Sequence, residues 1–510
     1  MNSEQGQALP LALVALTFGA LVMTPFLGHA GSAIIGSTVY DQSLRGQYSS
    51  DAAIEHAIWR LTNDGLAEQL SSPGDNVTYQ LSEAINGVAP TITVIADEIG
   101  GGGASGNITD EVIDTLDFET NGAEPARVIN ISGDIYALVY TDGKDDGWLK
   151  TVAVAGSGDI ADTAIDSLEF DTTQGQWADI IHVSGDTCAI VYRGDKGDGF
   201  LKTVSVAADG EITDTVVDSF EFDTRSCIYP EIVHVSGDIY AIAYQGDKSD
   251  GYVTTVEIAP DGAITGSVVD ALEFDTGNGR EPDIIHISGD IYAIAYRGDG
   301  KDGYVTTVEI APDGAITDTV VDTLEFNPQE CYFPNIIPVS GDVFAIAYAG
   351  AGNGDSWGGI VTTVGIAADG EIAGSVIDEA VFDSGNGEFP EIIHAGGDVY
   401  AVAYTGPGDD GWLETVEIAS NGSIAGDVID SLEFDDRVGY YPDIIHVSGG
   451  VFAIAYTGTN QRHGILKTVE IATGGTTAAT YAVVASGEST IRALVEIDGG
   501  VPSVISWQIE

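Results

Sequence analysis

Short apolar stretches alternate with turn residues through most of this chain, and the pattern recurs at a fixed interval. One unit contains four runs rich in Val, Ile, Tyr, Thr and Phe, at residues 284–288, 291–296, 304–310 and 320–326. These residue types are typical of β-strands. Ser-Gly-Asp and Asp-Gly sequences separate the runs and favour tight turns, because Gly and Asp tolerate positive φ. Each unit therefore predicts four antiparallel strands.

A phenylalanine closes each fourth strand and marks the register of the repeat. Successive phenylalanines lie 52 residues apart, except for one step of 56 residues between Phe326 and Phe382; the full series is Phe118, Phe170, Phe222, Phe274, Phe326, Phe382 and Phe434. Four strands in a repeat of this size are typical of one blade of a β-propeller. The sequence thus predicts a mainly β protein with a seven-bladed β-propeller over residues 112–473.

The two ends of the repeat are out of phase. The first run, 112–118, is a fourth strand without the three that should precede it, and the last unit stops after its third strand, 466–471. We expect the first run to complete the last blade, so that the ring closes with no open edge. Turns of a meander alternate between two faces, so both chain ends should leave the ring on one face. The loops before each first strand then lie on the other face.

The N-terminal region has a different pattern. Residues 8–26 carry no charge and are mostly Ala, Leu, Val and Phe, which is long enough for a helix to cross a bilayer. An amphipathic helical pattern follows, with Ala53, Ala57, Ile58 and Leu61 on one face. One interpretation of this region is a simple signal anchor followed by a surface helix.

Residues 6–13 (GQALPLAL), the apolar segment and residues 48–61 (YSSDAAIEHAIWRL) together resemble the N-terminal region of bacterial type IV pilin-like proteins, particularly minor pilins. The resemblance implies a leader, residues 1–6, that a prepilin peptidase removes after Gly6, leaving Gln7 first. It also implies a long helix over 7–65, whose apolar part, 8–36, serves the membrane and the filament, and other pilin-like subunits as partners. Leu11 stands where most pilins carry glutamate, which suits a minor or tip subunit.

Strand patterns flank the repeats. Residues 77–81 and 91–95 precede them, and 481–485, 490–497 and 501–510 follow them. We expect these five strands to form one small sheet packed on the helix, a pilin-like α+β head split between 66–98 and 478–510. Residues 99–111 are expected to be a linker because of their Gly-rich composition. The propeller would then be inserted into this head.

The net charge of the chain is −63, from 80 acidic and 17 basic residues. This balance excludes nucleic acid as a partner, because the chain lacks cations to neutralise phosphates. The acidity fits a solvated shell for saline surroundings or solubility, or divalent-cation binding. Of three cysteines, Cys188 replaces the tyrosine found at Tyr240 and is expected in the core. Cys227 and Cys331 lie two blades apart, too far for a disulfide.

The loops before the first strands carry the candidate ligand-binding residues. An aromatic residue stands at one position in five of them, before a proline in all but the first, and these residues are Trp177, Tyr229, Phe333, Phe389 and Tyr441. Such rings could stack on sugars or anchor a protein partner, or could form a hydrophobic plug. The residue after the proline is acidic in five blades, whereas Arg127 and Asn335 depart from the pattern. We regard these two departures as further candidates.

Aspartate pairs occur in the hairpins between second and third strands: Asp195 with Asp198, Asp247 with Asp250, and Asp299 with Asp302. Carboxylates in short Gly-containing loops can bind calcium, the one cofactor that the sequence suggests, or can simply shape turns. Five histidines recur at one strand position: His182, His234, His286, His394 and His446. One per blade is too dispersed for a shared metal ion, so we expect them to hydrogen-bond between blades.

No nucleophile elbow, phosphate loop or paired-histidine zinc helix is present in the sequence. The sequence therefore predicts a binding protein rather than an enzyme. By the pilin resemblance it would be anchored in the cytoplasmic membrane or a pilus, with the propeller extracellular and used for adhesion or for binding a glycan or protein ligand. Two alternatives stay open: a membrane-tethered extracellular enzyme acting on polysaccharide, and a structural spacer subunit.

Overall fold

A computed structural model describes the chain in two compact units, residues 1–100 with 477–510 and residues 101–476. The described residues are 106–351, 357–426, 428–458 and 462–472 in the second unit, and 53–54, 56–58, 60–61, 66, 70, 76–80, 90–99, 479–486, 490–498 and 501–509 in the first. The expected leader, its processing site at Gly6 and Gln7, and the apolar segment 8–36 lie outside them. Within the described part, no helix has the length and apolar character needed to cross a membrane.

The first unit contains a five-stranded antiparallel sheet in the order β1-β2-β32-β33-β34. The strands are β1 (Asn76–Gln80), β2 (Thr91–Ile99), β32 (Ala479–Ser486), β33 (Thr490–Asp498) and β34 (Val501–Ile509). Strand β2 pairs with β32, so two strands that precede the repeats and three that follow them share one sheet.

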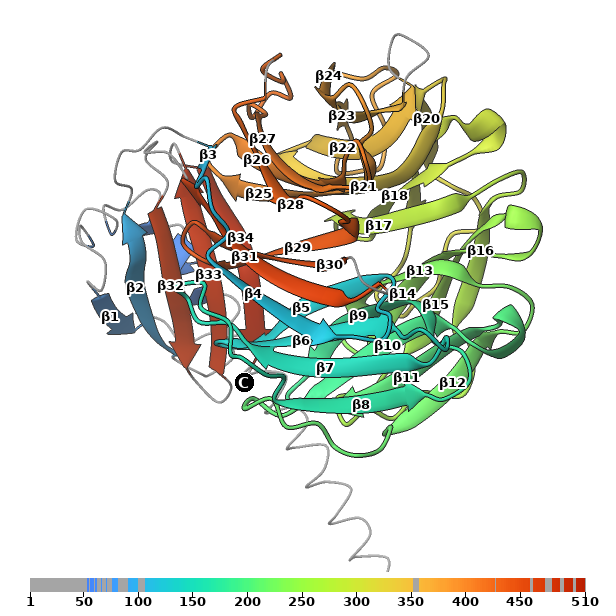
Figure 1. Ribbon diagram of the computed structural model, residues 1–510, viewed down its shortest axis with the longest axis horizontal. Coiled ribbons are helices and arrows are strands. Elements are labelled where there is room, and N and C mark those ends of the chain that lie inside the picture. Colours follow the sequence, from blue (N-terminus) through green and yellow to red (C-terminus); the bar gives the residue numbers. More distant parts are fainter. Residues whose placement is uncertain are drawn as a thin grey trace, which may run out of the picture. The chain divides into compact units, whose positions relative to one another are not determined.

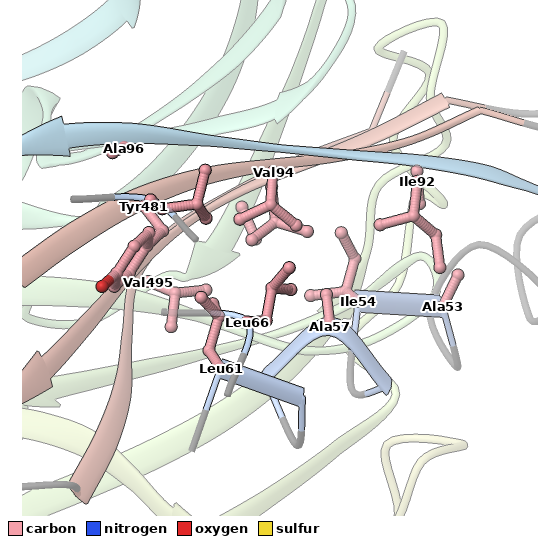
Figure 2. Close-up of a cluster of buried hydrophobic side chains, with 14 residues drawn as sticks. Ala53, Ile54, Ala57, Leu61, Leu66, Ile92, Val94, Ala96, Tyr481 and Val495 are labelled. Carbon is pink, nitrogen blue, oxygen red and sulfur yellow. The ribbon is translucent and has the colours of Figure 1, made fainter. Parts of the chain in front are cut away.

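The core of this unit lies between that sheet and a short helical stretch. Residues 53–54, 56–58 and 60–61 are helical, and Ala53, Ile54, Ala57 and Leu61 are buried against alternate residues of β2 and against β32 and β33 (Figure 2). The strand residues in this contact include Ile92, Val94, Ala96, Tyr481 and Val495. Alternate strand residues face one side, which explains the spacing of two in β2. The rest of the helix expected over 7–65 lies outside the described residues.

Among the described residues, the second unit contains six four-stranded antiparallel sheets and one five-stranded sheet, numbered here as blades 1 to 7 (Figure 1). Blade 1 contains β5 (Ala126–Ser132), β6 (Ile135–Thr141), β7 (Gly147–Ala153) and β8 (Asp166–Asp171). Blade 2 contains β9 (Gln176–Ser184), β10 (Thr187–Arg193), β11 (Gly199–Ser205) and β12 (Asp218–Asp223). Blade 3 contains β13 (Ile228–Ser236), β14 (Ile239–Gln245), β15 (Gly251–Glu257) and β16 (Asp270–Asp275).

Blade 4 contains β17 (Arg280–Ser288), β18 (Ile291–Arg297), β19 (Gly303–Glu309) and β20 (Asp322–Asn327). Blade 5 contains β21 (Cys331–Ser340), β22 (Val343–Ala351), β23 (Trp357–Gly365) and β24 (Asp378–Asp383). Blade 6 contains β25 (Glu388–Gly396), β26 (Val399–Thr405), β27 (Gly411–Glu417) and β28 (Asp430–Asp435). Blade 7 contains β29 (Tyr440–Ser448), β30 (Val451–Thr457), β31 (Gly464–Ala472) and, from the start of the repeats, β4 (Asp114–Glu119).

Strand β4 pairs with β31, aligning Leu116 with Leu466 (Figure 1). The orphan fourth strand therefore completes the last blade, as the phase of the repeat predicts. A short strand, β3 (Asn107–Ile108), also pairs with the end of β31, although it lies in the segment expected to be a linker. The chain consequently enters and leaves this unit at neighbouring strands.

The first strands of the seven sheets surround a common axis. Each of β5, β9, β13, β17, β21 and β25 contacts the first strand of the next sheet, and β29 contacts β5. Among the described strands no backbone ladder joins one blade to the next. The expectation that closure leaves no open edge is therefore wrong: blades pack through side chains, so every sheet stays open and keeps its own edges. Acidic residues along outer strands such as β8 discourage edge-to-edge pairing.

The closing phenylalanine of each repeat packs against a glycine. A Cβ atom added to Gly147, the first residue of β7, would lie 2.4 Å from the ring of Phe170 on β8. The same contact joins Gly464 of β31 to Phe118 of β4. This packing explains why both residues recur at fixed positions. Cys188, Cys227 and Cys331 are buried free thiols, and Cys188 is a core residue, as expected.

The recurring histidines bond within their own hairpins. His286 Nε2 lies 2.9 Å from the carbonyl oxygen of Gly289, three residues along the turn, and the other four histidines make the equivalent contact. In blade 1, Asn130 takes this place and donates to the Gly133 carbonyl at 2.8 Å. The expectation of bonds between blades is wrong, because the Nε2 atom of each histidine meets a carbonyl oxygen of its own turn.

Candidate functional site

The residues that precede the prolines lie inside the first strands rather than in the loops before them. In blade 4, β17 begins at Arg280, and its register with β18 shifts between Arg280 and Asp283. Such a β-bulge redirects side chains. The residue at the bulge has left-handed backbone geometry in six blades, with φ of 52° at Glu281, 49° at Phe333 and 50° at Tyr441. Bulky residues rarely adopt this geometry, and backbone strain of this kind clusters at functional sites.

Five aromatic side chains at this position form a continuous chain of ring contacts, which we call the aromatic collar: Trp177, Tyr229, Phe333, Phe389 and Tyr441. Successive centroids lie 4.8, 5.6, 4.3 and 4.0 Å apart. All five side chains are partly exposed. The collar therefore combines the two alternatives of the sequence analysis, since its rings pack together and still present apolar surface.

Blade 4 interrupts the collar with a buried glutamate. Glu281 pairs with Arg297 at 2.5 Å and accepts the Phe333 backbone N–H at 3.0 Å. Its carboxylate is thus held by partners in blades 4 and 5. The gap is bridged by Tyr229 of blade 3, whose ring meets that of Phe333 in blade 5.

Two residues further along each first strand lies the position that the sequence analysis singled out, which we call the polar ring: Arg127, Asp179, Glu231, Asp283, Asn335, Glu391 and Asp443. Its shorter members link neighbouring blades through the backbone. Asp179 accepts the Ile232 N–H at 3.0 Å, Asp283 that of Ile336 at 2.7 Å, and Asn335 that of Ile392 at 3.0 Å. Asp443 closes the series by accepting the Val128 N–H at 2.6 Å.

The two glutamates of the polar ring have one methylene more and reach Arg127. The guanidinium lies 2.5 Å from Glu391 and 3.1 Å from Glu231, with Asp443 at 3.9 Å. Arg127 in blade 1 therefore connects blades 3, 6 and 7 near the axis. The difference between Asp and Glu was visible in the sequence and could have separated the residues that link blades from those that pair with Arg127.

Burial shapes the protonation of this ring. It raises the pKa of Asp283 and that of Asp443 to about 7, and raises the pKa of Glu231 above its usual range. Burial alone would lower the pKa of the Arg127 guanidinium, but Glu391 and Glu231 outweigh it and keep the pKa well above its usual value. The five carboxyl groups of the polar ring thus share one arginine, Arg127, and some of these carboxyl groups hold protons near neutral pH.

The collar and the polar ring enclose a cavity of about 220 Å³. Tyr229, Phe333, Phe389 and Tyr441 line it together with the prolines that follow the last three, and all seven members of the polar ring line it too. Six of the seven predicted ligand-binding residues therefore meet at one place. Trp177 does not line the cavity but packs on Tyr229, with Arg193 5.1 Å from its ring.

The aspartate hairpins form separate turns, one per blade. Residues Asp195–Gly197, Asp247–Ser249 and Asp299–Lys301 are short 3-10 turns, η2 to η4, and the N–H of Asp198, Asp250 and Asp302 closes each on the first aspartate carbonyl. Within the described part of the chain, no three His, Cys, Asp or Glu side chains gather as metal ligands. Calcium binding at these hairpins stays a prediction.

No family model and no curated protein matches the chain. Solved structures resemble it over most of its length. A 6-phosphogluconolactonase candidate from Bacteroides uniformis is 10% identical with a TM-score of 0.46, covering 74% of this chain and 100% of its own. An α-L-arabinanase from Penicillium chrysogenum is 11% identical (TM-score 0.39; 71% and 98% covered), and the WD40 domain of SCAP from fission yeast is 12% identical (0.35; 69% and 98%). At these identities and scores the likenesses assign no activity.

Proposed function

We propose that this protein is a cell-surface binding protein that captures a glycan in the cavity between the aromatic collar and the polar ring. The observation that carries the proposal is the composition of that cavity. Partly exposed aromatic rings offer flat apolar surfaces, and carboxylates and Asn335 offer hydrogen-bond acceptors beside them. Ligand sites combine a mainly apolar lining with a few fixed polar groups, and sugars present both apolar faces and hydroxyl donors.

Display at the cell surface is the second part of the proposal. The pilin-like N-terminal sequence supports a membrane or pilus anchor with other pilin-like subunits as partners. The neighbouring strands β3 and β31 support a propeller inserted as a module into another domain. A protein ligand in place of a glycan would also use the collar, because exposed aromatic residues anchor protein interfaces.

The proposal is tested by applying the full chain to a glycan array and then measuring the affinity of the best ligand. Tyr441→Ala and Phe389→Ala should weaken binding, because each removes a ring from the cavity wall. Val217→Ala, which changes an exposed residue just before β12, is the control and should bind normally. If no glycan binds, or if the collar variants bind as well as the control, the proposal fails.

A second candidate function is hydrolysis of a glycosidic bond. It is favoured by the raised pKa of Asp283 and Asp443, about 7 in both, because a carboxyl group that holds its proton near neutral pH can act as a general acid. Turnover of array-selected glycans by the wild-type chain, abolished in Asp443→Asn or Asp283→Asn, would replace capture by catalysis.

A further inference from the structure

A tyrosine hydroxyl and an acidic group meet at most interfaces between neighbouring blades. The tyrosine is the last residue but one of a second strand, and the acidic residue directly follows the closing phenylalanine of the preceding blade. Tyr192 donates to Asp171 at 2.8 Å, and Tyr404 donates to Asp383 at 3.1 Å. Because the repeat places these residues at equivalent positions in each blade, the blades can be compared residue by residue.

In three blades a lysine ammonium completes this contact. Lys202 Nζ donates to the Phe170 carbonyl at 2.6 Å and to Asp171 at 2.9 Å. Lys150 and Lys467 make the same two bonds in blades 1 and 7. Blades 3, 4 and 5 carry a neutral threonine at the lysine position: Thr254, Thr306 and Thr362.

Blade 6 places a glutamate there. Glu414 is 8% exposed, and its Oε2 atom has no hydrogen-bond partner. It lies beside Asp383 and Tyr404. The Tyr404 hydroxyl donates to Asp383 and also lies within hydrogen-bonding reach of Glu414. Its single proton cannot serve both carboxylates at once, and the Oε2 atom of Glu414 still has no partner. Two carboxyl groups therefore stand where blades 1, 2 and 7 have one carboxylate and one ammonium.

We propose that Glu414, Asp383 and the main-chain carbonyl of Phe382 bind a divalent cation of the calcium class at the place that a lysine ammonium takes in blades 1, 2 and 7. The ligands are hard oxygens, which suit calcium, and water can complete the coordination shell. Charge also favours a divalent ion. One ammonium balances one carboxylate where a lysine is present, and two positive charges would balance Glu414 of blade 6 and Asp383 of blade 5.

The surroundings of Glu414 also favour a positively charged partner. Burial, together with the charge of Asp383, raises the pKa of Glu414 to about 7. A buried carboxyl group with an unsatisfied oxygen is costly, and either a proton or a cation must satisfy it. The orphan Oε2 atom and the carbonyl that accepts lysine elsewhere favour the cation.

The repeat itself supplies the variants for a test. Glu414→Lys and Glu414→Thr introduce residues that other blades carry at this position, so both should fold. Calcium is titrated into the full-length wild type and both variants by calorimetry in about 0.15 M salt, where screening weakens diffuse attraction to the acidic surface. Magnesium is titrated in parallel, and melting temperatures are recorded with calcium and with chelator.

We expect the wild type to bind one more calcium ion than either variant and to gain more thermal stability from calcium. Glu414→Lys should match the calcium-loaded wild type even with chelator present. Equal stoichiometry and equal calcium-induced shifts in all three proteins would overturn the proposal. So would a wild type whose excess stability over Glu414→Thr depends on acid pH alone, because a proton would then satisfy Glu414. Calcium bound at the aspartate hairpins is common to all three proteins and cancels in the comparison.

Discussion

The Arg127 guanidinium lies 2.5 Å from the carboxylate of Glu391, 264 residues further along the chain. The same guanidinium lies 3.1 Å from Glu231, so one side chain links blade 1 to blades 3 and 6. Arg127→Ala would leave these buried carboxylates without their cation. We expect the free energy of unfolding to fall by about 3–5 kcal/mol, measured by urea denaturation.

The matched control for this prediction is an exposed ion pair. Arg437 pairs with Asp436 at 3.6 Å, with side chains 64% and 83% exposed. Solvent screens such pairs, so Arg437→Ala should change the free energy of unfolding by less than about 1 kcal/mol. Equal losses in the two variants would show that Arg127 does not stabilise the ring through its carboxylates.

Stability should depend on pH through the polar ring. Asp283 and Asp443 keep protons up to about pH 7 in the folded state, whereas the unfolded chain releases them near about pH 4. The folded state thus binds more protons in this window, and the free energy of unfolding falls as pH rises from about 4 through 7. The charged groups facing these two are Arg127, Asp179 and Glu391.

Carboxyl groups whose pKa is lowered in the folded state limit the stability of the protein at acid pH. Burial raises the pKa of Asp171, but its bonds to Lys202 and Tyr192 outweigh burial and lower it overall. The stability that Asp171 contributes is present above about pH 4 and is lost in stronger acid. We therefore expect the melting temperature to peak in mildly acidic buffer, and a peak above pH 8 would contradict this assignment.

Asp443→Asn tests the same idea at one residue. Asn335 already holds the equivalent position in blade 5, where its side-chain oxygen accepts a backbone N–H of the next blade. An asparagine at 443 can accept the Val128 N–H in the same way. The variant should fold normally and show a shallower fall of melting temperature between pH 5 and 8. An unchanged slope would mean that Asp443 carries no extra proton.

The histidine hairpins offer a separate test of local structure. His286→Ala removes the contact with the Gly289 carbonyl, and we expect a loss of about 0.5–1.5 kcal/mol in the free energy of unfolding. His286→Asn should recover most of it, because Asn130 makes this bond in blade 1. If His286→Asn is no more stable than His286→Ala, the loss of stability comes from the packing of the histidine ring on Tyr292 instead.

Two glycines of blade 3 test the packing of the closing phenylalanine. A Cβ at Gly251 would lie 2.4 Å from the Phe274 ring and 3.0 Å from the backbone of Gly279, whereas nothing lies within 4 Å of one at Gly266. Gly251→Ala should destabilise the protein by about 1–3 kcal/mol through overpacking. Gly266→Ala should leave the melting temperature unchanged or raise it.

Much of the fold follows from local sequence patterns. Turn residues and β-branched runs predict the strands of each blade, and the misplaced first run predicts the pairing of Leu116 with Leu466. These features depend on hydrogen bonding between whole segments, which a repeat specifies many times over. The edges of the sheets and the bulges depend on where each ladder of backbone hydrogen bonds stops. The sequence predictions were wrong at both places: each sheet keeps open edges, and the first strand of blade 4 begins at Arg280 instead of residue 284.

The sequence predicted which residues belong to the site but did not predict how they contact one another. The break in the repeat singles out Arg127, but its partners in blades 3 and 6 depend on how far each side chain reaches. The left-handed backbone at Tyr229 and Phe333 has no local signal, since a residue before proline usually prefers extended geometry. Glu414 did have a signal, because lysine or threonine fills that position in every other blade, and the sequence analysis overlooked it.

The affinity of an array-selected glycan for the wild-type chain, Tyr441→Ala and Val217→Ala, measured side by side by calorimetry, tests the central claim most directly. The account predicts that Tyr441→Ala weakens binding at least about tenfold, corresponding to about 1.4 kcal/mol, and that Val217→Ala binds as the wild type does. Equal affinity of all three proteins would contradict the assignment of the cavity between collar and polar ring as the binding site.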